Sequence, residues 1–182
     1  MKKIFLPLTE KTIRKLKAGD EIELWGTLYT ARDKAHQRLT EVFKKRKRPP
    51  VHLAGQVIYY TGPTAKRPGW AIGSCGPTTS SRMDAFTPLL LSKGVKAMVG
   101  KGDRSPEVIK AIKRHRAVYL VTPGGIGALL SQKVHTAEIV AYKDLGPEAI
   151  YKLQVRAFPA TVAIDWQGNS IFRRYSEKRR KK

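Results

Sequence analysis

Cysteine occurs once in the 182 residues, at Cys75, and this scarcity excludes an internal disulfide. A lone thiol is typical of a reducing compartment, so we expect a cytoplasmic protein. Long apolar runs are also lacking: no stretch approaches a membrane span, and residues 4–8 are too short to be the apolar part of a signal peptide. The 41% hydrophobic content is enough for one core, and we expect a single domain over residues 1–175. The tail 176–182 has no apolar period and is expected to be disordered.

Acidic residues are scarce as well. There are 14 Asp and Glu against 36 Lys and Arg, which gives a net charge of +22. Such a balance is typical of proteins that bind nucleic acid or an acidic membrane surface. The densest blocks, residues 44–48 and 173–182, lack the series of aromatic residues that a base-stacking surface needs. We therefore favour a solvated surface, or attraction of a dicarboxylate or an acidic partner subunit, over specific nucleic-acid binding.

The most informative segment is Gly-Pro-Thr-Thr-Ser-Ser-Arg-Met-Asp at residues 76–84. It places two hydroxyls and an arginine where an apolar stretch at 70–72 gives way to helical spacing at 83–91. Free backbone N–H groups at a helix start attract anions, and an arginine can bind a carboxylate through two hydrogen bonds. Two more cationic motifs, at residues 31–36 and 100–105, occupy similar junctions. The three junctions predict one converging anion pocket.

Hydrophobic periodicity predicts an alternating α/β chain with helices packed against a mixed sheet. We expect strands near residues 21–30, 57–60, 70–72, 97–99, 117–122, 138–142 and 161–165. Helices are expected at 9–18, after Asp33, after Thr78, after Ser105 and from Gly124 onward. Thr9 and Ser105 are the expected N-cap residues.

Three motifs together resemble a known family: Arg32-Asp33 with His36, Gly76-Pro-Thr-Thr with Arg82-Met-Asp, and Lys101-Gly-Asp-Arg-Ser. They are similar to the beta subunit, or C-terminal domain, of the class I iron-sulfur hydro-lyases, which include fumarases and L-tartrate dehydratases. The similarity continues through Pro123-Gly-Gly and Phe158-Pro-Ala to Asp165 and Gly168-Asn, so it covers nearly the whole chain in order. The resemblance implies the swivelling β/β/α fold. It also implies an alpha subunit whose cysteines hold a 4Fe-4S cluster, since one cysteine cannot hold it here.

The resemblance further implies the site residues. Thr78 matches the candidate catalytic base, and its alkoxide would need stabilisation by the helix start and by nearby positive charge. Substrate binding is expected of Arg32, Arg82, Lys101 and Arg104, and supporting roles of Asp33, His36 and Thr79; no residue is expected to bind metal. Lys101-Gly-Asp-Arg-Ser is closer to the fumarase version of this motif than to the tartrate version, although Asp103 replaces the usual asparagine.

Each assignment has a structural alternative. Thr78 and Thr79 could both be helix caps, and Thr79 is the better candidate for that role. Asp33 could be an N-cap and His36 a hydrogen-bonded histidine at the core edge. Cys75 is interpreted as packing, and the Gly124-Gly-Ile-Gly segment as a close-packed helix start that lacks the spacing of a phosphate-binding loop.

The sequence thus predicts the beta subunit of a two-subunit class I fumarate hydratase, which interconverts fumarate and L-malate and is inactive without its alpha subunit. The nearest alternative is the beta subunit of an L-tartrate dehydratase. An alternative of another class is a basic nucleic-acid-binding protein, whose binding would fall steeply with salt.

Overall fold

The computed structural model describes residues 1–173, and the basic segment 176–182 lies outside them. Its main element is a seven-stranded sheet of order β1-β2-β3-β4-β5-β7-β6. The strands are β1 (Lys2–Phe5), β2 (Glu21–Thr30), β3 (Val57–Tyr59), β4 (Ala97–Gly100), β5 (Val118–Val121), β6 (Val134–Ala141) and β7 (Ile150–Ile164). Strands β1 to β5 pair in parallel, whereas β7 is antiparallel to β2, β5 and β6. The predicted α/β class with a mixed sheet is confirmed.

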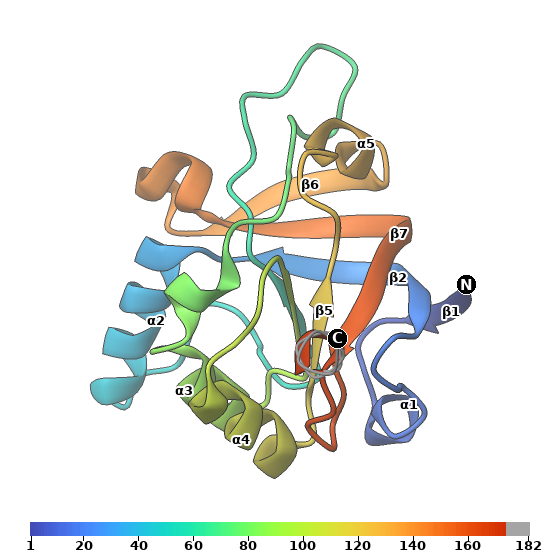
Figure 1. Ribbon diagram of the computed structural model, residues 1–182. Coiled ribbons are helices and arrows are strands. Elements are labelled where there is room, and N and C mark those ends of the chain that lie inside the picture. Colours follow the sequence, from blue (N-terminus) through green and yellow to red (C-terminus); the bar gives the residue numbers. More distant parts are fainter. Residues whose placement is uncertain (174–182) are drawn as a thin grey trace.

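The long strand β7 joins the two ends of the parallel part of the sheet. It pairs with β2 along almost the whole of that strand, with Lys152 opposite Tyr29 at one end and Thr161 opposite Glu21 at the other. Beyond Thr161 the strand pairs with β5, ending with Tyr119 opposite Ile164. The strands β2, β3, β4, β5 and β7 therefore form a closed ring of hydrogen-bonded neighbours, and Figure 1 shows how β7 runs along β2 and then bends to lie beside β5.

Alternating side chains along the strands supply two separate cores, because successive residues of a strand face opposite ways. On β3, Val57 and Tyr59 belong to the cluster that also contains Ile13. Ile58 and Tyr60 belong to the cluster beneath the longer helices. Both faces of β3, β4 and most of β5 are thus buried, which is why these three strands are short apolar runs in the sequence.

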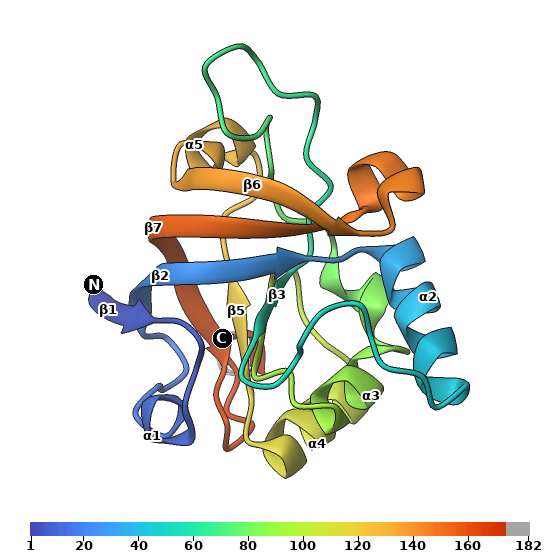
Figure 2. The ribbon, with the colours of Figure 1, turned by 180° about the vertical axis from the view of Figure 1, so that it is seen from behind.

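Helices cover the sheet unevenly. The α-helices are α1 (Glu10–Ile13), α2 (Asp33–Lys44), α3 (Thr87–Ser92), α4 (Pro106–His115) and α5 (Gly127–Ser131), and the 3-10 helices are η1 (Ser80–Met83) and η2 (Lys143–Glu148). Helices α2, α3 and α4 gather on one side, and both views show α5 beside the projecting loop between β3 and η1 (Figures 1 and 2). Over residues 1–173, every helix is too short or too polar to cross a membrane.

Several predicted elements differ from the structure. The expected strand at residues 70–72 is absent, because the chain folds back there and the Thr64 amide donates to the Ser74 carbonyl. The expected helix after Thr78 is split into η1 and α3, since Pro88 has no amide to continue a helix and instead starts a new one. The first helix is shorter than predicted, although Thr9 caps it as expected. Ser105 is likewise the N-cap of α4.

Candidate functional site

The carboxyl ends of the parallel strands carry the predicted site segments. Residues 31–36 follow β2, residues 101–105 follow β4, and the Pro123-Gly-Gly segment follows β5. Thr78 reaches the same edge, because its amide donates to the carbonyl oxygen of Tyr60 (2.7 Å), just beyond β3. Ligands of open parallel sheets bind at this end of the strands. The three junctions therefore meet at one edge of the sheet, and a pocket for an anion there stays a prediction.

Thr78 lies directly beside Lys101. The Lys101 amide donates to the Thr78 carbonyl (3.3 Å), and the Ser80 amide donates to the Lys101 carbonyl (3.0 Å). Thr79 occupies the N-cap position of η1 but its side chain makes no capping hydrogen bond. Thr78 is half-buried, and in the described part of the chain its hydroxyl has no hydrogen-bond partner. Thr79 is thus the N-cap residue, as expected, although only its backbone serves the cap, whereas Thr78 is not at the cap position and its hydroxyl is left available to a ligand.

Arg82 and Arg32 are brought together by one carboxylate. Asp33 Oδ1 accepts a hydrogen bond from Arg82 Nε (3.0 Å), and Asp33 Oδ2 lies 2.9 Å from Arg82 Nη2 as an ion pair without hydrogen-bond geometry. Arg32 lies 3.8 Å from the same carboxylate and 3.8 Å from that of Glu148. The N-cap interpretation of Asp33 is wrong, because Arg32 is the N-cap residue of α2 and Asp33 is its first helical residue. Asp33 instead aligns the arginines of two junctions.

Lys101 and the glycine-rich segment are also neighbours. The Lys101 side chain is exposed, and a Cβ added at Gly124 would lie 3.8 Å from its Cδ. A Cβ added at Gly127 would lie 2.6 Å from the amide nitrogen of Gly76. The interpretation of this segment as a close-packed helix start is therefore confirmed. Its packing places the start of α5 against the loop that leads to Thr78.

Arg104 differs from the other predicted substrate residues because its side chain is fully enclosed. Its Nε donates to Asp84 Oδ1 (2.7 Å), and its Nη2 donates to Thr87 Oγ1 (2.6 Å). The aromatic rings of Tyr60 and Tyr119 lie 5.4 Å and 4.9 Å from its guanidinium carbon. Direct contact between Arg104 and a substrate stays a prediction, and in the arrangement described the guanidinium reaches no ligand at the surface.

His36 and Cys75 are both buried and uncharged. The Nδ1 atom of His36 lies 2.8 Å from the Arg32 carbonyl, and burial lowers the pKa of the imidazole to about 4. Burial raises the pKa of the Cys75 thiol to about 12, so it is a poor nucleophile and metal ligand. Among residues 1–173, no three His, Cys, Asp or Glu side chains are grouped as a metal site would require. These side chains do not fit an iron-sulfur cluster.

The sequence analysis missed the polar residues that lie beneath the site. Tyr119 and Ser80 are fully or almost fully buried and hydrogen-bonded to each other. Asp84 accepts from both Arg104 and the Ser105 amide. A tyrosine within the apolar strand predicted at 117–122 was the available signal, because a buried phenol must find a partner.

A substitution at Gly100, the last residue of β4, would test this packing. An added Cβ would lie 2.0 Å from Ser80 Oγ and 3.0 Å from a ring carbon of Tyr60. Overpacking of this kind costs about 1 to 3 kcal/mol, so Gly100→Ala should lower the free energy of unfolding in urea by that amount. Gly124→Ala is the control, since its nearest contact is an ordinary one and its stability should stay close to wild type. Equal stability of the two variants would contradict the packing described.

The fold is that of an α/β domain in which Arg82, Lys101 and the Thr78 hydroxyl lie at one edge of the sheet. The family described as "Fumarase C-terminus" matches residues 1–175, so the chain belongs to this family, as the resemblance predicted. The chain is 40% identical to a protein of Methanocaldococcus jannaschii whose assigned name is L(+)-tartrate dehydratase subunit beta, over 98% of this chain and 94% of that protein.

Two fumarate hydratases are also similar. The anaerobic class I fumarate hydratase of Escherichia coli is 38% identical over 98% of this chain. The mitochondrial fumarate hydratase 1 of Leishmania major is 37% identical over 92%. The chain spans about a third of each of these enzymes, 32% and 31%, but nearly the whole tartrate dehydratase subunit. All three relatives are thus named for adding or removing water.

Proposed function

We propose that this chain is the beta subunit of a class I fumarate hydratase and interconverts fumarate and L-malate together with a separate alpha subunit. The observation that carries the proposal is the placement of an unpartnered Thr78 hydroxyl at the sheet edge that also presents Arg82 and Lys101. Hydration of a dicarboxylate needs cations for the carboxylates and a group that moves a proton at carbon. At this edge of the sheet, Arg82 and Lys101 are the cations and Thr78 is the group that moves the proton. A lone buried thiol favours a reducing compartment such as the cytoplasm.

Within this proposal the residues have distinct roles. Arg82 and Arg32 hold one carboxylate of the substrate, and Lys101 holds the other or stabilises charge that develops during the reaction. Thr78 transfers the proton, and the surrounding cations lower the cost of its alkoxide. Asp33 orients the arginines. Arg104 acts from the interior by holding Asp84, and Thr79 and His36 support the loops on which the site stands.

The 4Fe-4S cluster is proposed to lie on the alpha subunit, because this chain has neither the number nor the kind of thiols to hold it. When bound, the cluster supplies a Lewis-acidic iron to the reaction. The similarity to a whole dehydratase subunit, rather than to a whole fumarate hydratase, supports the two-chain arrangement.

L-tartrate dehydration is the second candidate. It is favoured by the relative from Methanocaldococcus jannaschii, which is similar over almost its full length. Fumarate is favoured by the Lys101-Gly-Asp-Arg-Ser motif. The same purified complex should be assayed with L-malate and with L-tartrate, and the substrate with the larger kcat/KM identifies the enzyme.

The dependence on a partner gives a direct test. The isolated chain should fold but should bind no iron and show no hydratase activity, whereas coexpression with a cysteine-bearing alpha subunit should give an iron-containing, active complex. The measurements are iron content, cluster absorbance and conversion of fumarate. A reconstituted isolated chain with cluster absorbance and fumarate turnover would disprove the two-subunit proposal.

A further inference from the structure

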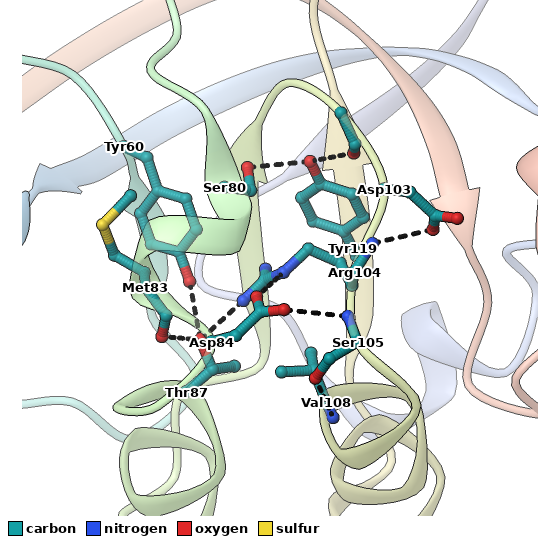
Figure 3. Close-up of polar contacts among 11 residues, drawn as sticks. Tyr60, Ser80, Met83, Asp84, Thr87, Asp103, Arg104, Ser105, Val108 and Tyr119 are labelled. Atoms are coloured by element: carbon teal, nitrogen blue, oxygen red, sulfur yellow. Dashed lines mark hydrogen bonds and ion pairs between the residues drawn. The ribbon is translucent and has the colours of Figure 1, made fainter.

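Tyr119 joins the two loops that carry the proposed catalytic and substrate-binding residues. Its hydroxyl lies 2.8 Å from Ser80 Oγ and 2.8 Å from the carbonyl oxygen of Gly102 (Figure 3). A carbonyl can only accept, so Tyr119 donates its single proton to Gly102 and accepts one from Ser80. Burial raises the pKa of the Tyr119 phenol, so the donor proton is retained at all physiological pH values.

The two partners of Tyr119 lie next to the site in sequence. Ser80 follows Thr78 by two residues, and Gly102 directly follows Lys101. Thr79 and Lys101 also form an isolated parallel bridge, so the loops run side by side at the surface while the phenol joins them from beneath. Two backbone hydrogen bonds join the loops at the surface, and the Tyr119 hydroxyl is the side-chain group that joins them from the buried side.

The ring of Tyr119 is itself held in place. The Arg104 guanidinium stacks on it at 4.9 Å and is fixed by Asp84, which accepts from Arg104 and from the Ser105 amide. Tyr60 stacks on the other side of the guanidinium at 5.4 Å, as Figure 3 shows. Tyr119 has little freedom to follow either loop if that loop moves, because its ring is packed and its hydroxyl bonded on two sides.

We propose that Tyr119 is a positioning residue, which sets the distance between the Thr78 hydroxyl and the Lys101 ammonium through its hydrogen bonds to Ser80 and Gly102. It touches no substrate. The proposal rests on the proposed function for the roles of Thr78 and Lys101, but the coupling of the two loops does not. Small displacements of reacting groups lower turnover strongly, so loss of the bridge affects kcat more than the stability of the fold.

The test compares Tyr119→Phe with Tyr60→Phe. Both tyrosines are buried and stack on Arg104, and each substitution removes one hydroxyl while keeping the ring. Among residues 1–173, the Tyr60 hydroxyl bonds to Thr87 Oγ1 of α3 alone and does not join the two site loops. In the assembled enzyme, Tyr119→Phe should lower kcat roughly tenfold with a smaller change in KM. Both variants should lower the melting temperature, because each loses a buried hydroxyl group, but Tyr60→Phe should keep kcat within about twofold of wild type.

Amide hydrogen exchange tests the coupling without any enzyme assay. In the isolated chain, Tyr119→Phe should speed exchange together in residues 76–84 and 100–105, whereas Tyr60→Phe should not. Ser80→Ala removes the hydrogen-bond partner of the Tyr119 hydroxyl. The increase in exchange rate in the double variant should therefore be no larger than in Tyr119→Phe alone. If Tyr119→Phe failed to fold, Ser80→Ala alone should still speed exchange in both segments.

The outcomes separate the two proposals. An inactive wild-type complex disproves the proposed function, while faster exchange of both segments still supports the coupling. An active wild-type complex in which Tyr119→Phe and Tyr60→Phe have equal kcat values and equal exchange overturns the positioning role of Tyr119. Exchange that rises in one segment only also overturns it, because a bridge must release both.

Discussion

Replacing Thr78 with alanine should lower the turnover of the assembled enzyme by roughly a hundredfold or more, while substrate affinity and melting temperature change little. The reason is that its hydroxyl caps no helix and bonds to no other group among residues 1–173, so the fold loses nothing when it is removed. The transition state, in contrast, loses the group that moves the proton. Steady-state rates and melting curves of the reconstituted complex measure the two effects separately.

Thr79→Ala is the matched comparison, since it removes the same hydroxyl one residue further along. Thr79 is exposed and makes no capping hydrogen bond, so this variant should have far smaller losses of turnover than Thr78→Ala and nearly wild-type stability. A Thr78→Ala enzyme that is destabilised but fully active would refute the catalytic assignment. Equal losses of turnover in both variants would show that the loop, rather than one hydroxyl, is needed.

Removing either surface cation of the site should impair the use of dicarboxylates. Arg82→Ala and Lys101→Ala should each lower kcat/KM on the order of a hundredfold, since loss of a desolvated charge contact costs about 2 to 5 kcal/mol. Most of the effect should be in KM if the contact is equally strong in the ground state and the transition state. Iron content should be unchanged, because neither residue is proposed to contact the cluster.

Arg38→Ala is the control for Arg82→Ala. Arg38, which lies on α2, also binds an aspartate, because its guanidinium donates two hydrogen bonds to Asp144. It lies outside the set of residues proposed to bind substrate, so its loss should leave kcat/KM close to wild type. Wild-type kinetics of Arg82→Ala and Lys101→Ala at low and at moderate salt would show that the proposed carboxylate site is wrong.

The parts of the fold that could be predicted are those with a local signal. The strand at 21–30 has apolar alternation, and the helix after Ser105 has a cap, a first-turn proline and an apolar stripe. The first half of β7 could not be found, because it mixes Tyr151, Lys152 and Gln154 with apolar residues and depends on pairing with β2 and β6 for its extended form. Strand formation there is a tertiary effect.

The candidate site shows the same limit. The motifs correctly indicated which loops converge, because strand ends of a parallel sheet meet at one edge. They could not show that Asp33 binds Arg82 in preference to Arg32, or that Arg104 points inward to Asp84. The direction of a long side chain is decided by partners far away in sequence, and a motif contains no information about them.

The closed ring has a consequence for the order of events on the ribosome. Every residue proposed to bind substrate or transfer a proton lies at or before Arg104, whereas the strand that completes the ring spans Ile150–Ile164. The emerging chain can form α2 or α4 early, but the pairing of β7 with β2 spans more than a hundred residues and must wait until this strand has left the exit tunnel. The sheet edge that carries Arg82 and Lys101 is therefore among the last parts of the domain to acquire its final shape, and until then these side chains belong to an incompletely folded nascent chain.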